Sequence, residues 1–147
     1  APMHLEKQFD VKRPRAAVVD VLARDETLIE LFPEQETEIV DSRGNRRTTR
    51  TRYRALGREG EVTFHFCFES DGNIRFEKDC DGRIWRELKG LVSFEERGQG
   101  TRVRLELEGR TKALVPEFTV KGQMQSQLEE MSEALRRRIA ASGKKKG

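Results

Sequence analysis

The sequence predicts an α+β fold in which one antiparallel sheet curls around a single long helix, and two patterns predict it. Residues 64–68 carry a phenylalanine at every second position, which places three rings on one face of a strand because strand side chains alternate sides. From about residue 117 onward, apolar residues recur at steps of three and four, the spacing of an amphipathic helix. That helix is available to cover the apolar face of the sheet.

The composition is that of a globular domain. The 147 residues fit one domain, expected over residues 3–142 and followed by a disordered basic tail over 143–147. No apolar run approaches the roughly 18 to 20 residues of a membrane span, and the first residues lack the features of a signal peptide, so the expected compartment is the cytoplasm. The formal charge of +3 is too small to indicate a nucleic-acid partner.

Basic residues nevertheless cluster in two places. One is an arginine-rich strand within residues 43–58, and the other is the C-terminal end, with arginines at 136–138 and lysines at 144–146. The C-terminal cluster could make peripheral contact with an anionic membrane. Cys67 and Cys80 form neither a disulfide framework nor a metal-binding spacing, so both thiols are expected to be reduced.

The N-terminal part predicts one strand and two short helices. Alternating apolar residues indicate a strand over residues 4–11, in which Lys7 is the odd member. Pro14 suits the first turn of a helix, because its missing N–H would have no intrahelical partner there. Asp25 is expected to cap a second short helix, which Pro33 ends.

Residues 36–56 predict a hairpin whose turn contains a Gly-Asn pair. A register that pairs Glu38 with Arg50, and likewise Glu36 with Arg52, would balance much of the arginine charge across the two strands. The arginines of the second strand then form a solvated outer face. The expected inward side of that strand holds Thr49, Thr51, Tyr53 and Ala55.

The next hairpin can be assigned a register. A three-residue loop over 70–72, with its glycine in the left-handed conformation, places Phe68 opposite Ile74 and Phe66 opposite Phe76. A two-residue loop would instead pair phenylalanines with charged residues. The chosen register also puts the two cysteines on opposite faces, which excludes a disulfide between them.

The last hairpin and the final helix follow. Residues 83–95 and 101–111 predict two strands, and a bulge near Gly90 would explain why the first carries apolar residues on both sides. The helix begins near residue 117 and is expected to end at Gly143. Its apolar stripe consists of Val120, Met124, Leu128, Met131, Leu135 and Ile139.

Motifs that signal chemistry are missing from the sequence. There is no glycine-rich phosphate loop, no Gly-x-Ser-x-Gly elbow and no His-Glu-x-x-His, so we assign no catalytic residue, cofactor or metal ligand. His4 lies near a terminus. His65 is expected on the face opposite the phenylalanines, where a surface position or a cross-strand pair with Glu77 is favoured over catalysis.

Some polar residues share the expected inward side with the phenylalanines. A buried cation must be paired or solvated, so Lys78 or Arg86 on the inside would suit a ligand that carries a carboxylate or a carbonyl. Alternatively, both lie near the rim of the sheet and extend to water. The phenylalanines likewise could line a ligand cavity or fill a solid core.

Several short motifs lie along nearly the whole chain: Pro33 after the paired helices, Leu88-Lys89-Gly90 followed by Phe94, the Gly100-Thr101-Arg102-Val103 return, and Pro116 before the last helix. With this order of elements, the sequence resembles the START/polyketide-cyclase-like (SRPBCC) superfamily, most closely its cyclase/dehydrase and coenzyme-Q-binding branch. The resemblance implies a helix-grip fold, with seven antiparallel strands around the last helix and two short helices after the first strand. It also implies an internal cavity for a lipid-, quinone- or polyketide-like molecule, often bound without being transformed.

The leading hypothesis is a module that binds or carries a small hydrophobic ligand between the sheet and the last helix. A second hypothesis is an enzyme of the polyketide cyclase/dehydratase type, which would need an ionisable group such as Tyr53, Lys78 or Arg86 in the cavity. A third is a basic surface that contacts RNA, the ribosome or an anionic membrane. The residues expected to bind the hydrophobic ligand are Tyr53, Phe64, Phe66, Phe68, Phe76, Arg86, Leu88, Leu105, Met124 and Leu128.

Overall fold

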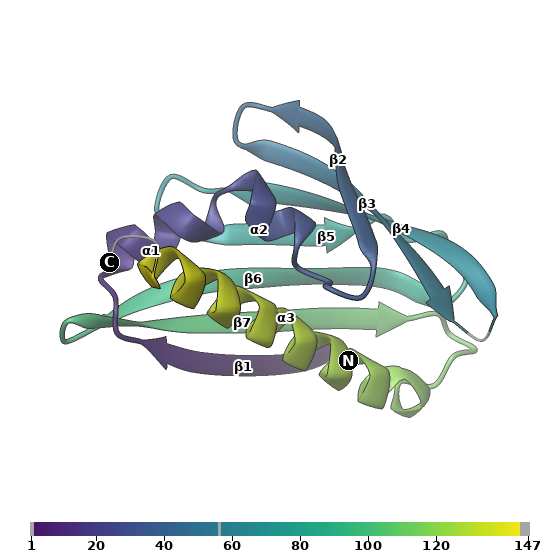
Figure 1. Cartoon of the computed structure of the whole chain (residues 1–147). Coiled ribbons are helices and arrows are strands. Elements are labelled where there is room, and N and C mark those ends of the chain that lie inside the picture. Colours follow the sequence, from purple (N-terminus) through teal and green to yellow (C-terminus); the bar gives the residue numbers. More distant parts are fainter. Residues whose placement is uncertain (1, 56, 145–147) are drawn as a thin grey trace.

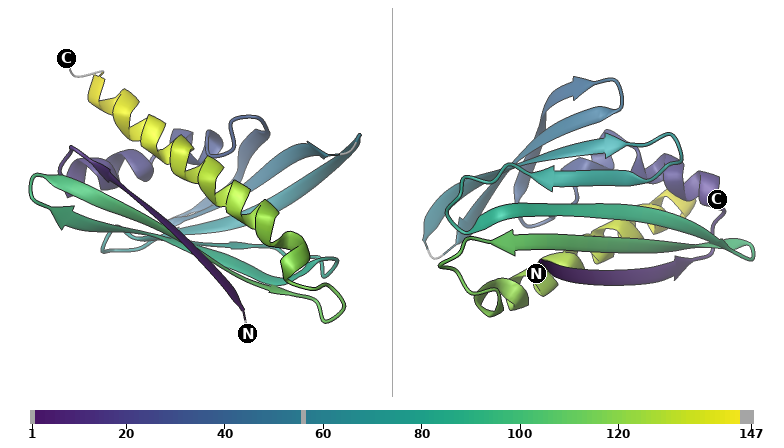
Figure 2. Two further views of the ribbon diagram at one scale, coloured as in Figure 1. Left: turned by 90° about the horizontal axis from the view of Figure 1, so that it is seen from below. Right: turned by 180° about the vertical axis from the view of Figure 1, so that it is seen from behind.

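The computed structural model describes residues 2–55 and 57–144. Seven antiparallel strands form one sheet in the order β1-β7-β6-β5-β4-β3-β2, and three helices lie on one face of it (Figures 1 and 2). The strands are β1 (Met3–Val11), β2 (Glu36–Arg43), β3 (Arg46–Ala55), β4 (Arg58–Phe68), β5 (Ile74–Lys78), β6 (Trp85–Arg97) and β7 (Gly100–Thr111). The helices are α1 (Arg15–Leu22), α2 (Asp25–Ile29) and α3 (Phe118–Lys144). This arrangement confirms the expected α+β fold class.

The register predicted for β4 and β5 is confirmed. Phe66 lies opposite Phe76 and Phe68 opposite Ile74. Gly72 adopts a φ of 93° in the connecting loop, a conformation that is strained for any residue with a Cβ. Both cysteines are free thiols.

The arginine-rich strand β3 is also paired as predicted. Glu38 lies opposite Arg50 and Glu36 opposite Arg52 in the β2–β3 ladder. The neighbouring strand β4 adds acidic partners, because Glu61 lies 3.4 Å from the Arg52 guanidinium and Glu59 forms a comparable pair with Arg54 at 2.9 Å. The outer face of this hairpin is therefore a mixed-charge surface rather than a basic stripe.

Three local expectations were wrong. The N-cap of α2 is Arg24, which makes no side-chain cap hydrogen bond, whereas Asp25 is the first helical residue and accepts a hydrogen bond from Arg47. Helix α2 ends at Ile29, one turn before Pro33, and α3 continues through Gly143 to Lys144. The part of the expected basic tail at residues 145–147 lies outside the described residues.

The bulge expected near Gly90 lies elsewhere. Gly90 pairs regularly with Leu107, and the ladder between β6 and β7 is irregular between Trp85 and Glu87 instead. Arg86 is the extra residue at that irregularity. Because a strand alternates sides, the insertion returns Trp85 to the inward face that Leu88 also occupies.

Helix α3 supplies the cover of the sheet. It packs along β1 and β7 and against α1, and it crosses the sheet obliquely in the view from below (Figure 2). All six residues of its predicted apolar stripe are buried. The helix therefore lies over one side of the sheet, while strands β2 to β4 extend beyond it (Figure 1).

Candidate functional site

The space between the sheet and α3 is closed at one end. There α1 packs against α3, β6 and β7. Val18, Val21 and Leu22 of α1, Val103 of β7 and Ile139 of α3 are each at most 1% exposed. Aliphatic side chains fill this end, which lies at the left of Figure 1.

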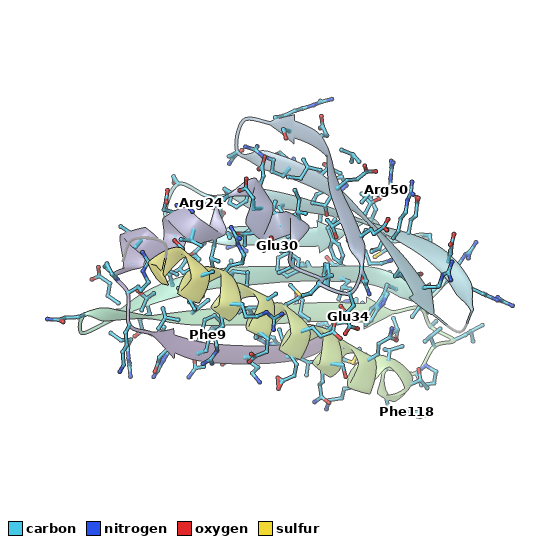
Figure 3. All side chains as sticks on the ribbon, viewed as in Figure 1. Phe9, Arg24, Glu30, Glu34, Arg50 and Phe118 are labelled. Atoms are coloured by element: carbon cyan, nitrogen blue, oxygen red, sulfur yellow. The ribbon has the colours of Figure 1, made fainter. Side chains whose placement is uncertain are left out.

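The opposite end of the same space is more open to solvent. Trp85 and Leu88 face inward from β6 but are only half-buried. Ile84 precedes β6, and its carbonyl accepts a hydrogen bond from the backbone of the segment that leads into α3. In that segment and at the start of α3, Leu114 is 96% and Phe118 80% exposed, and Phe118 stands clear of the fold in Figure 3. Apolar side chains thus reach solvent at one end of the sheet–helix space.

An aromatic cluster lies on the sheet between these two ends. The rings of Phe66 and Phe76 have centroids 5.6 Å apart, and the Phe64 ring lies 6.2 Å and 6.3 Å from these two. Phe32, from the segment after α2, stacks on Phe64 with a centroid separation of 6.0 Å. Such separations are those of favourable aromatic pairs. Phe64 is the half-buried member of the cluster.

The residues expected to bind ligand fall into three groups by exposure. Five are buried in the core, three are half-buried, and two are exposed. The buried ones are Phe66, Phe76, Leu105, Met124 and Leu128; the half-buried ones are Phe64, Phe68 and Leu88; the exposed ones are Tyr53 and Arg86.

The two exposed residues depart from the expected inward cluster. Arg86 lies at the β6 irregularity with an exposed side chain, so the expected inward position of this cation is corrected. Tyr53 shares the inward side of β3 with the buried Thr49 and Thr51, but its ring lies across Gly60 of β4 and is 39% exposed. Lys78 is half-buried and lies opposite Phe64.

Two aromatic residues of this region were missed by the sequence reasoning. Nothing in the spacing of Phe32 shows that it stacks on Phe64. Strict alternation along β6 puts Trp85 on the side opposite Leu88, and only the irregularity at Arg86 brings the two to the same side. The Trp85 ring occupies the space that a Cβ on Gly109 would need, so a glycine opposite a tryptophan was the available signal.

The histidines lie on the outer face of the sheet. His65 lies opposite Glu77, as expected, and its ring contacts the Thr48 hydroxyl at 2.9 Å and the Asp79 carboxylate at 3.0 Å. Among the described residues, the group spaced for a metal ion is His4, Glu6 and Glu106, whose ligand atoms lie within 4.8 Å of one another. His4 and Glu6 are exposed, and the His4 ring is 3.3 Å from the Glu106 carboxylate.

Two shallow hollows in the described part of the chain lie away from the open end at Trp85 and Leu88. One, of about 170 Å³, lies on the outer face of the sheet over Leu91. The other, of about 350 Å³, lies between the segment after α2 and the C-terminal half of α3. The tight packing of Phe66, Leu105 and Met124 agrees with a sheet–helix space that side chains largely fill.

Several solved structures have the same fold as this chain. No family model and no curated protein matches the chain. Among solved structures, an aromatase/cyclase from a Streptomyces species has a TM-score of 0.78 and 16% identity, with 100% of this chain and 97% of that chain covered. A START superfamily protein from Mycobacterium smegmatis has a TM-score of 0.73 and 18% identity, covering 94% and 97%. A STAR-related lipid transfer protein from Xanthomonas axonopodis has a TM-score of 0.66 and 15% identity, covering 93% and 85%.

The chain therefore has the START-like, helix-grip fold of SRPBCC proteins, as the resemblance predicted. The similarity extends over nearly the whole chain in each of these comparisons. Within the described residues, no helix is both long and apolar enough to cross a membrane.

Proposed function

We propose that this protein binds a small hydrophobic molecule at the open end of the space between the sheet and α3. The observation that carries the proposal is the change in exposure along the inward face, from the closed aliphatic end at α1 to the half-buried Phe64, Trp85 and Leu88. Large apolar groups left partly in water are typical of ligand and partner sites. The structural likeness to an aromatase/cyclase and to a lipid transfer protein supports the same class of ligand.

Apolar burial would supply most of the affinity. Covering a large side chain such as Phe64 completely is worth about 1.5–3 kcal/mol. A lipid-, quinone- or polyketide-like molecule offers the complementary apolar surface. Lys78, which is half-buried and opposite Phe64, would orient a carbonyl or carboxylate on that molecule.

The proposal is of binding and assigns no reaction. Tyr53, Lys78 and Arg86 come from three different strands, and no hydrogen bond joins any two of them in the described part of the chain. The basic-surface hypothesis has less support, because Arg50, Arg52 and Arg54 of β3 are paired with glutamates of β2 and β4.

Native mass spectrometry and the fluorescence of Trp85, the single tryptophan, test the proposal. The chain would be mixed in turn with a long-chain fatty acid, a short-chain quinone and an aromatic polyketide. We expect a one-to-one adduct with at least one of them and a change in Trp85 emission on binding. Phe64→Ala should weaken that binding about tenfold or more, because it removes an apolar contact of that size.

Val40→Ala is the matched control, because Val40 is also a partly exposed apolar residue but lies on the edge strand β2. It should leave the affinity unchanged. The proposal is wrong if none of the three compounds forms an adduct. It is also wrong if a compound does form an adduct but binds the Phe64→Ala and Val40→Ala variants with equal affinity.

A further inference from the structure

The hollow between α2 and α3 has the features of a second binding site, and Phe32, which stacks on Phe64, forms part of its wall. It measures about 350 Å³, within the range of about 300–1,000 Å³ that small-molecule sites occupy. Ile29 and Pro33 line it from the α2 side, and Ala134 and Ala141 line it from α3. Ile29 is exposed although α2 has a buried face available. The hollow therefore presents an apolar wall on each side.

Its charged lining is unbalanced. Arg137 and Arg138 of α3 contribute two guanidinium groups, and Glu30 contributes one carboxylate. Arg138 donates from Nη1 to Glu30 Oε2 at 3.2 Å. Its Nε is buried and donates to no acceptor among the described residues. Protein atoms enclose this Nε, so a molecule in the hollow would meet the Nη groups instead.

We propose that the hollow binds a small monocarboxylate with a short apolar chain. The carboxylate would accept a hydrogen bond from Nη2 of Arg138, since Glu30 pairs with Nη1, and would lie near the positive charge of Arg137. The chain would lie against Ile29, Ala134 and Ala141. One negative charge on the ligand balances the excess positive charge of the lining.

Glu30 acts as an internal competitor in this site. Its carboxylate already accepts a hydrogen bond from Arg138, and its negative charge repels a second carboxylate nearby. The two partners of the ion pair therefore have opposite expected effects on binding. Glu30→Gln should raise the affinity for a monocarboxylate, and Arg138→Gln should lower it. If the Glu30–Arg138 ion pair only held α2 to α3, the two substitutions would change the affinity in the same direction, because each of them breaks the same contact.

Octanoate is the probe, and octanamide, which has the same chain and no charge, is its matched comparison. Titrations of the full chain would be followed by amide chemical shifts in two-dimensional NMR. Octanoate should shift signals from residues 29–35 and 134–141 and should bind about tenfold more tightly than octanamide, the factor expected for a hydrogen bond to a charged group. Glu30→Gln should bind octanoate several-fold more tightly, and Arg138→Gln about tenfold more weakly.

Glu34→Gln is the charge-matched control, because Glu34 is an exposed acid of the same segment that does not line the hollow (Figure 3). It should leave octanoate binding unchanged. Because Glu30→Gln is expected to gain affinity, poor folding of a variant cannot imitate the result. Equal binding of octanoate and octanamide, or unchanged affinity in Glu30→Gln, overturns the proposal. So does octanoate binding that is lost in Phe64→Ala but kept in Arg138→Gln, since the ligand would then occupy the sheet–helix space.

Discussion

Gly90 shows how one residue shapes the aromatic cluster on the sheet. It lies directly opposite Phe76 in the β5–β6 ladder, and the Phe76 ring covers its Cα so closely that a Cβ would overlap three ring atoms. Phe76 is itself buried and cannot move aside freely. The missing side chain at Gly90 therefore makes room for the Phe76 ring, and the glycine is not part of a bulge.

Replacing Gly90 by alanine should lower the free energy of unfolding by about 1–3 kcal/mol, the usual cost of an overpacked core. Chemical denaturation of the variant measures this change. The double variant Gly90→Ala/Phe76→Leu has a smaller side chain next to the new methyl group. Its free energy of unfolding should therefore fall by less than the sum of the decreases in the two single variants.

Gly122→Ala provides the control at the same scale. Gly122 lies in α3, and a Cβ there would meet nothing within 4 Å. The substitution should stabilise the protein by about 0.5–1 kcal/mol, since glycine is a poor residue inside a helix. If both alanine variants destabilise equally, the cause is not the contact with Phe76.

At the scale of elements, β1 is held to β7 by charged pairs on the outer face as well as by the ladder. Arg102 of β7 donates two hydrogen bonds to the Asp10 carboxylate of β1, at 2.8 Å and 3.2 Å. The two residues lie directly opposite each other. On the inward face, Lys7 pairs with Glu129 of α3, which explains the one charged residue among the apolar ones of that side.

The hydrogen bonds from Arg102 hold the pKa of Asp10 below its ordinary value of 3.8. Because the folded-state pKa is the lower one, the pair stabilises the protein above the unfolded-state pKa, and this contribution is lost as pH falls through the folded-state pKa. The stability advantage of the native chain over Asp10→Asn should therefore be constant near neutral pH and shrink below about pH 4. Urea denaturation at a series of pH values measures it.

The same comparison in an Arg102→Gln background isolates the pair. Without the guanidinium donor, the effect of Asp10→Asn should be smaller and should depend less on pH. An unchanged pH dependence would show that a group other than Arg102 perturbs Asp10.

At the scale of the whole molecule, the sequence predicted strand register best where an alternating pattern was combined with a second constraint, such as a turn or opposite charges. The three-residue loop and the run of phenylalanines defined the β4–β5 register, and the Glu38–Arg50 pairing was found because opposite charges limited the choice. Periodicity failed at Arg86, since one inserted residue reverses the side of every residue before it. It also could not reveal that Phe32 stacks on Phe64, because that contact joins segments far apart in the chain and depends on tertiary packing.

The candidate sites were predictable only in part for the same reason. The residues of the sheet–helix core follow from alternation, but their exposure depends on where α1 and α3 lie over the sheet. The hollow lined by Glu30 and Arg138 joins residues 108 positions apart, and no local pattern marks either of them.

The position of α3 over one side of the sheet predicts that stability is unevenly distributed. Strand β7 lies between β1 and β6, and its Leu105 is 1% exposed, whereas β2 is an edge strand with a bulge and mostly exposed side chains. Amide protons of β6 and β7 should exchange only on global unfolding, and those of β2 through local opening. Hydrogen exchange followed by NMR measures both.

Leu105→Ala separates the two exchange routes. Removing a buried leucine should lower the global free energy of unfolding by about 2–5 kcal/mol, and amides that exchange through global unfolding should lose the same amount of protection. The amides of β2 should change little, because their local opening does not expose Leu105. If protection in β2 falls as much as in β7, the sheet opens as one cooperative unit, and the half of the molecule that extends beyond α3 is as stable as the half beneath it.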